Sequence, residues 1–144
     1  MLSKPFISVV LLCVVCLPST ATAEREQAEM PEFVSRHLMA TMRNHLEALE
    51  DISRLLSERR YDKAADLVEQ HLGMSSIEMH YEKHVGKYMP SGMRSLATEM
   101  HGEATRFAVS ARNAEKAGGS DEMFAALADV MGRCVACHSA YRAQ

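Results

Sequence analysis

Apolar residues return at every third or fourth position over two stretches in the first half of the chain. The first stretch runs from Glu32 to about Glu58, and the second from Lys63 to Leu72. This spacing places apolar side chains on one face of a helix. The first apolar face comprises Leu38, Met42, His45, Leu49, Ile52 and Leu56, widened by Met39 and Leu46. The pattern predicts two amphipathic helices, separated by a short break in which Asp62 is the expected N-cap.

The second half of the chain repeats this spacing over two further stretches. One extends from about Gly92 to Ala117, and Gly118-Gly119 ends it. Its apolar face comprises Met93, Leu96, Met100, Ala104, Phe107, Ala111 and Ala114. The last stretch begins after Ser120, and its apolar face comprises Phe124, Leu127, Met131, Cys134, His138 and Tyr141. Two more amphipathic helices are therefore predicted.

The segments between these patterns are short. Ser75-Ser76-Ile77-Glu78 fits a capping box, which predicts further helical turns to about His84. Val85 to Ser91 is expected to be a loop, and the polar segment from Glu24 to Met30 is expected to be loose. The chain has only 7 Gly and 4 Pro among 144 residues, which also favours helices. Four amphipathic helices with short connections predict an all-α fold, an antiparallel four-helix bundle.

Residues 1–23 have the features of a secretory signal peptide. Lys4 supplies a positive charge, Phe6 to Leu17 is apolar, and Ala21-Thr22-Ala23 matches a cleavage site before Glu24. The apolar run is too short to span a bilayer comfortably, so cleavage is favoured over a membrane anchor. We therefore expect a single mature domain, residues 24–144, located in the periplasm and without a membrane span.

The strongest chemical signal is Cys134-Val135-Ala136-Cys137-His138, the C-x-x-C-H attachment sequence of c-type haem. Two thiols can add to the haem vinyl groups, and the adjacent imidazole can bind the iron. In a helix, the two thiols and the imidazole stand at i, i+3 and i+4, on one face. The motif predicts one covalently bound haem c on the C-terminal helix.

Paired cysteines can also form a redox dithiol or bind zinc. A redox dithiol of the thioredoxin type needs a βαβ domain after the motif, but only six residues follow His138. A closed zinc site needs two more ligands, and the mature chain has no cysteine beyond Cys134 and Cys137. Both alternatives are therefore less favoured than haem.

Charge excludes one class of partner. The full chain has a formal net charge of −3. Removing a leader whose only charged side chain is Lys4 leaves 15 basic and 19 acidic residues, a charge of −4. Because no basic stripe is present to neutralise phosphates, we expect no nucleic-acid partner.

The mature chain resembles the class II cytochromes c, the cytochrome c′ group, in which haem is attached near the C-terminus of a secreted four-helix bundle. The specific match is the ending C-x-x-C-H-x-x-Y-R, which continues from the haem motif to Tyr141 and Arg142. The resemblance implies thioether bonds at Cys134 and Cys137, proximal iron ligation by His138, and a position for Arg142 near the haem edge. Members of this family often form dimers, so a homodimer is left open.

The second axial ligand decides what such a haem can do. The stretch from Met39 to Leu46 resembles the distal helix of the family, and Met39 falls on the position that faces the iron. We therefore expect Met39 as the distal ligand, with Met42, His37 or no protein ligand as alternatives. Methionine is also a common core residue, so packing is the competing role for Met39.

A haem with Met and His ligands passes single electrons, so we expect a periplasmic electron carrier that docks transiently on redox proteins. The alternative is a five-coordinate haem that binds NO or CO. We expect no enzyme, although weak peroxidase activity is left open because Arg36 or His37 could lie near the distal face.

The remaining histidines and tyrosines carry weaker signals. His80 and His84 stand at i, i+4 and could bind a divalent metal, but an exposed polar face is the favoured reading. His71 and His101 are expected to be surface or hydrogen-bonded histidines. Tyr61, Tyr81 and Tyr88 are expected to cap the core.

Overall fold

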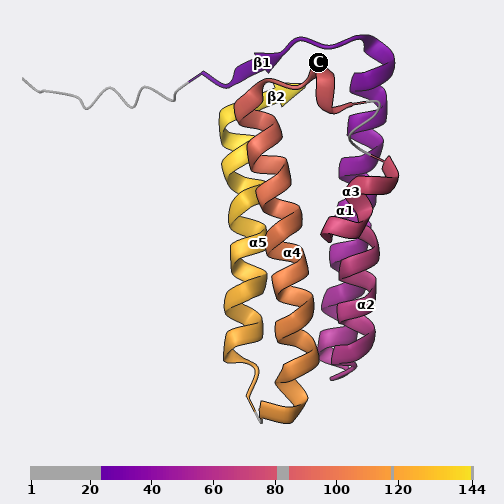
Figure 1. The fold of residues 1–144 in the computed structure, drawn as a ribbon, viewed down its shortest axis with the longest axis vertical. Coiled ribbons are helices and arrows are strands. Elements are labelled where there is room, and N and C mark those ends of the chain that lie inside the picture. The colour runs from indigo at the N-terminus through magenta and orange to yellow at the C-terminus, as the bar shows by residue number, and fades with distance from the viewer. Residues whose placement is uncertain (1–23, 81–84, 118, 144) are drawn as a thin grey trace, which may run out of the picture.

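The structure is a computed structural model that describes residues 24–80, 85–117 and 119–143. The proposed leader, residues 1–23, lies outside the described residues, as do Tyr81 and His84. In chain order the elements are β1 (Glu26–Ala28), α1 (Glu32–Ser57), α2 (Tyr61–His71), α3 (Met74–His80), the 3-10 helix η1 (Gly86–Tyr88), α4 (Ser91–Ala117), α5 (Asp121–Ala140) and β2 (Tyr141–Ala143) (Figure 1). The predicted all-α class is confirmed, because helices make up most of the described residues and the two strands have only three residues each.

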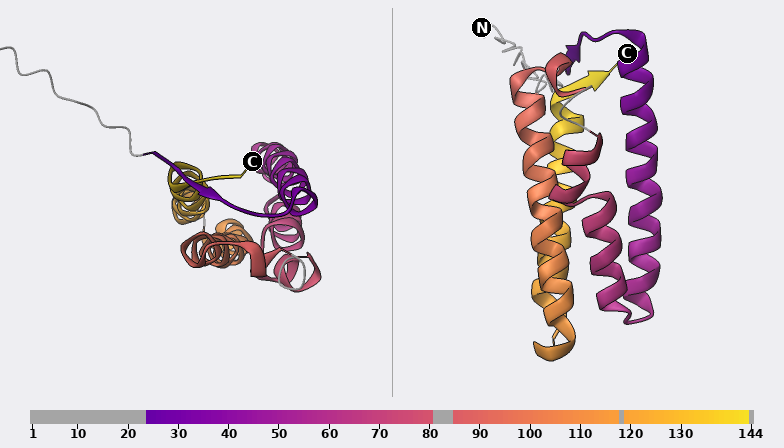
Figure 2. Two further views of the ribbon diagram at one scale, coloured as in Figure 1. Left: turned by 90° about the horizontal axis from the view of Figure 1, so that it is seen from above. Right: turned by 45° about the vertical axis from the view of Figure 1, so that its right-hand side comes forward.

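The long helices lie along a common long axis, and Figures 1 and 2 show their arrangement. α4 packs along α5, and α2 packs against both α1 and α4. The short α3 rests on α4 and α2. In the described part of the chain, α1 and α5 do not pack closely against each other. The space between these two helices is where the candidate site lies.

The turn between α1 and α2 differs from its prediction. Arg59 has a left-handed backbone, with φ of 57°, and the Arg60 amide donates to the Leu55 carbonyl at 2.9 Å. This is a Schellman ending, which reverses the chain at once. Arg60 rather than Asp62 therefore takes the N-cap position of α2, and its side chain makes no capping hydrogen bond. Asp62 lies in the first turn, where the helix dipole favours an acidic side chain.

The predicted capping box at Ser75 is replaced by contacts from other helices. α3 begins at Met74, whose amide donates to Thr105 Oγ1 at 3.0 Å. The Ser75 amide donates to Glu69 Oε1 at 3.2 Å. Burial alone would raise the pKa of Glu69, but hydrogen bonds from Ser75 and Thr105 outweigh it and lower that pKa. The start of α3 is thus fixed by α2 and α4.

The buried side chains form two clusters. The larger one lies among α1, α2, α4 and α5, and its largest fully buried members include Phe107, Ile52, Met123, Val68 and Val130. The smaller one lies near the strands and comprises Ala28, Val34, Leu38, Val85, Met89 and Met93. The predicted buried face of α4 is confirmed except that Leu96 is only partly buried.

The predicted apolar faces of α1 and α5 need correction. Leu46 is 69% exposed, so it does not widen the buried face of α1. On α5, Phe124 and Met131 are about half exposed, whereas Met123 and Val130 are buried. Because α5 packs mainly on α4, its buried face is rotated by one position from the predicted one.

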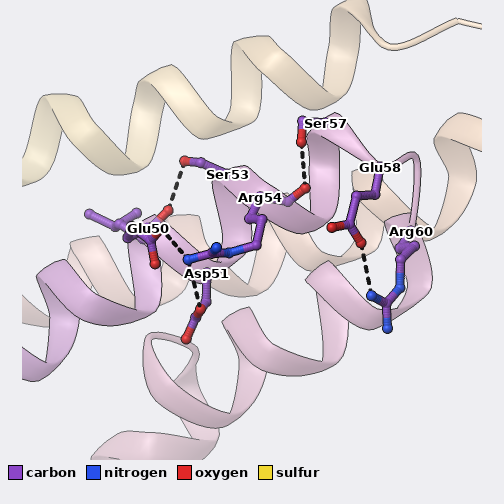
Figure 3. A network of polar contacts seen from close by, with 8 residues as sticks. Glu50, Asp51, Ser53, Arg54, Ser57, Glu58 and Arg60 are labelled. Carbon is purple, nitrogen blue, oxygen red and sulfur yellow. Dashed lines mark hydrogen bonds and ion pairs between the residues drawn. The ribbon is translucent and has the colours of Figure 1, made fainter.

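The outer surface near the end of α1 carries a network of charged side chains (Figure 3). Arg54 pairs with Glu50 and lies 4.0 Å from Asp51, and Arg60 pairs with Glu58 at 2.8 Å. These side chains are exposed, so solvent screens the pairs and each one adds little to stability. The network therefore keeps this face polar rather than holding the fold together.

The segment expected to be loose contains a strand. β1 pairs in parallel with β2, with Glu26 opposite Tyr141 and Ala28 opposite Ala143 (Figure 2). Ala28 is fully buried in the smaller cluster, which anchors the strand. The beginning of the proposed mature domain is thus held against the residues that follow His138.

Candidate functional site

The C-x-x-C-H motif lies on the last two turns of α5, as predicted. Cys134 and Cys137 are half-buried free thiols, and His138 is exposed. All three side chains line a cavity of about 280 Å³ between α1, α4 and α5. The helix therefore presents two thiols and one imidazole to the same space.

The thiols do not have the electrostatics of a reactive dithiol. Burial raises the pKa of Cys134, and burial together with the neighbouring Cys134 raises the pKa of Cys137. Reactive cysteines have lowered pKa values, typically near a helix N-terminus or a cation. Here both thiols lie toward the C-terminal end of α5, where the helix dipole disfavours a thiolate. This argues against a redox dithiol.

Metal binding by protein side chains alone has no support in the described part of the chain. No group of three or more His, Cys, Asp or Glu side chains is gathered there in a way that could hold a metal ion. His84 and the side chain of His80, for which an exposed polar face was favoured over a metal-binding pair, lie outside the described residues.

Opposite α5, the cavity wall is formed by α1. Leu38, Met39, Met42 and His45 line it, and Met39 remains 44% exposed. The two distal candidates Met39 and Met42 thus face the same cavity as the C-x-x-C-H side chains. His37 is exposed and is not among the lining side chains.

A third wall comes from α4 and the segment before it. Its lining side chains are mostly aliphatic or thioether groups: Met89, Met93, Leu96, Ala97 and Met100. Methionine side chains are flexible and polarisable, and they adapt to the shape of a flat apolar ligand. Residues of both core clusters contribute to this lining, so the cavity lies between the two clusters.

Two histidines line the cavity where α1 meets α4. The rings of His45 and His101 are 5.8 Å apart and nearly perpendicular. His101 Nδ1 donates to the Leu72 carbonyl oxygen at 2.7 Å, as expected for a hydrogen-bonded histidine. Burial, followed by the charges of His101 and His71, lowers the pKa of His45 to about 4. His45 is therefore neutral at physiological pH and adds no charge to the cavity.

The mouth of the cavity carries arginines. Arg142, which the family resemblance places near the edge of an expected haem, is on β2 and lines the cavity. Arg25 and Arg133 line it as well. The sequence did not indicate either residue as part of the site, although Arg133 directly precedes Cys134. Arg25 reaches the cavity because β1 pairs with β2, which was not predicted.

No protein-family model, no curated protein and no solved structure matches this chain. Among the described residues, no helix is long and apolar enough to cross a membrane.

Proposed function

We propose that this chain is a periplasmic c-type cytochrome that carries single electrons, built as an antiparallel four-helix bundle of the class II type. The observation that carries the proposal is the shared cavity of Cys134, Cys137 and His138 with the methionines of α1 and α4. The C-x-x-C-H motif and the apolar lining of the cavity each support haem as the ligand. The electron carrier would dock transiently on redox proteins.

The residues present fit a haem. Cys134 and Cys137 would hold it through thioether bonds, and the His138 imidazole would ligate its iron. Within the described chain, no side chain hydrogen-bonds to the His138 imidazole, and its exposed position leaves it available as a ligand. When bound, the haem would supply an iron that alternates between the ferric and ferrous states. The surrounding thioether and aliphatic side chains would exclude water from the ring.

Met39 is the proposed distal ligand. It lines the cavity from α1, on the wall facing α5, and its thioether is the ligand type that raises a haem potential and favours electron transfer. Met42 lines the same wall one helical turn further along and is the competing ligand. Because His37 does not line the cavity, it is the least favoured of the three candidates.

The test is the absorption spectrum of the mature holoprotein, oxidised and reduced, with and without CO. We expect a low-spin spectrum with the weak red band of methionine-to-ferric charge transfer and no response to CO. Met39→Ala should abolish that band and admit CO. Met42→Ala is the matched control from the same wall and should keep the wild-type spectrum.

Other outcomes discriminate between the hypotheses. A wild-type spectrum that is high-spin and shifts with CO would replace the electron carrier by the NO- or CO-binding alternative. A band lost in Met42→Ala instead of Met39→Ala would reassign the ligand. No covalent haem at all, from a host able to attach it, would refute both functions.

A further inference from the structure

The charge at the cavity mouth is opposite to that of the chain. Among the described residues, the lining includes Arg25, Arg133 and Arg142 and no Asp or Glu. The chain as a whole has a formal net charge of −3. An apolar cavity with a cationic mouth is complementary to a ligand that has an apolar body and anionic groups at one edge.

The three arginines differ in how their charge is balanced. Arg133 Nη1 lies 2.9 Å from Glu99 Oε2, and its Nη2 lies 3.9 Å from Glu103. Arg142 faces Glu24 at 3.6 Å. By contrast, Arg25 pairs with no carboxylate among the residues that the structure describes.

Arg25 is held at the site by backbone pairing. It directly precedes β1, which is hydrogen-bonded to β2 and anchored by the buried Ala28. Its Nη1 lies 3.4 Å from the carbonyl oxygen of His138, the proposed proximal ligand. The guanidinium is therefore carried to the haem-binding end of α5 by the beginning of the mature chain.

Resting on the proposed function, we infer that Arg25 is a positioning residue that binds a carboxylate of the haem. A haem has two propionate groups on an otherwise apolar ring, which matches a thioether-lined cavity with a cationic mouth. A guanidinium binds a carboxylate with strong, charge-assisted hydrogen bonds. The N-terminal strand then belongs to the cofactor site and does more than close the fold.

The competing role for Arg25 is purely structural. A cation near the last carbonyl groups of α5 interacts favourably with the helix dipole, whether or not a haem carboxylate is present. The two roles differ in their effect on the haem carboxylate, because only a guanidinium that binds a propionate donates hydrogen bonds to it. A guanidinium that binds a propionate lowers the pKa of that carboxyl group and raises the reduction potential, because a nearby positive charge disfavours the ferric state.

The experiment measures the reduction potential of the holoprotein as a function of pH for wild type, Arg25→Gln, Arg25→Lys and Arg36→Gln. Arg36 is the control: its exposed side chain pairs with Glu32 on α1 and does not line the cavity. Arg25→Gln and Arg36→Gln change the net charge equally.

We expect Arg25→Gln to lower the potential and to move the propionate-linked ionisation to higher pH. Arg36→Gln should leave both unchanged, and Arg25→Lys should restore most of the potential. If Arg25→Gln titrates like wild type and only unfolds more easily, Arg25 is a helix-end cation and the inference is wrong. If wild type itself carries no haem, the proposed function has failed and this inference with it.

Discussion

Gly92, in the first turn of α4, leaves room for the ring of Tyr141. A Cβ atom at this position would clash with the Tyr141 hydroxyl oxygen. Tyr141 follows the C-x-x-C-H motif and lines the candidate cavity. The glycine therefore lets the chain after α5 lie against the start of α4.

We predict that Gly92→Ala lowers the free energy of unfolding by about 1 to 3 kcal/mol, because the tyrosine ring must move. Gly132→Ala is the matched control: outside the local helix, no atom of the described chain lies within 4 Å of a Cβ built at this position of α5. That substitution should raise the free energy of unfolding by about 0.5 to 1 kcal/mol, because alanine favours the helix. Urea titrations followed by circular dichroism measure both. Equal stability of Gly92→Ala and wild type would show that Tyr141 moves at no cost.

The buried imidazole of His45 predicts a pH dependence of stability in the haem-free chain. Its pKa is about 4 in the folded state, against an ordinary value of 6.5. Between these values the unfolded chain binds the extra proton, so the free energy of unfolding should decrease as the pH falls from about 6.5 to about 4. The pKa difference corresponds to at most about 3 kcal/mol.

A Cys134→Ala/Cys137→Ala variant, which lacks the thiols that would attach the proposed haem, allows this measurement. Adding His45→Gln should make the decrease shallower without abolishing it, because burial also lowers the pKa of His101. The measurement is the midpoint of urea unfolding at several pH values. An identical pH profile with and without His45 would show that its imidazole is protonated as readily in the folded chain as in the unfolded one.

At the level of elements, the end of α1 shows a residue in an unfavourable conformation. Arg59 adopts a left-handed backbone, with φ of 57°, at the position of a Schellman ending that glycine usually occupies. Arg59→Gly should therefore raise the free energy of unfolding by about 1 kcal/mol. Arg60→Gly, at the next position and outside the left-handed region, should not be stabilising. Thermal or urea unfolding of the two variants tests this, and a destabilising Arg59→Gly would contradict it.

Helix periodicity predicts the existence and extent of α1, α4 and α5 well, because apolar residues recur along each of them over many turns. It does not predict β1 and β2, since three-residue strands have no measurable period and their pairing joins the two ends of the domain. It also misplaces the buried face of α5 by one position at Phe124 and Met131, because an alternation of three and four is compatible with neighbouring faces.

The candidate site divides in the same way. Local spacing predicts that Cys134, Cys137 and His138 share one face, and the cavity confirms that these side chains line one space. Arg25 could not be predicted, because only the tertiary pairing of β1 brings it to the cavity. The cavity itself also depends on the separation of α1 from α5, and no local pattern encodes that distance.

At the scale of the whole molecule, the cavity divides the hydrophobic core. On one side, the larger cluster includes Ile52 of α1 and Phe107 of α4. On the other, the smaller cluster includes Leu38 of α1 and Met93 of α4, and both of these side chains line the cavity. α1 and α4 therefore each contribute to the larger, fully packed cluster at one end and to the smaller cluster beside the cavity at the other. Apolar cavity walls without a ligand gain no packing energy across the gap.

This division predicts that the two halves of the core differ in local stability when the cavity is empty. In the Cys134→Ala/Cys137→Ala variant, amide hydrogen exchange should be slower at Ile52 and Phe107 than at Leu38 and Met93, by on the order of tenfold or more. Comparing positions within one helix controls for helix propensity. If the proposed haem is attached, protection at Leu38 and Met93 should rise more than at the other two positions, because contacts with the haem would fill the cavity beside them. Uniform protection along α1 and α4 in the haem-free variant would mean that the core is one cooperative unit, and that the cavity is closed by the protein alone.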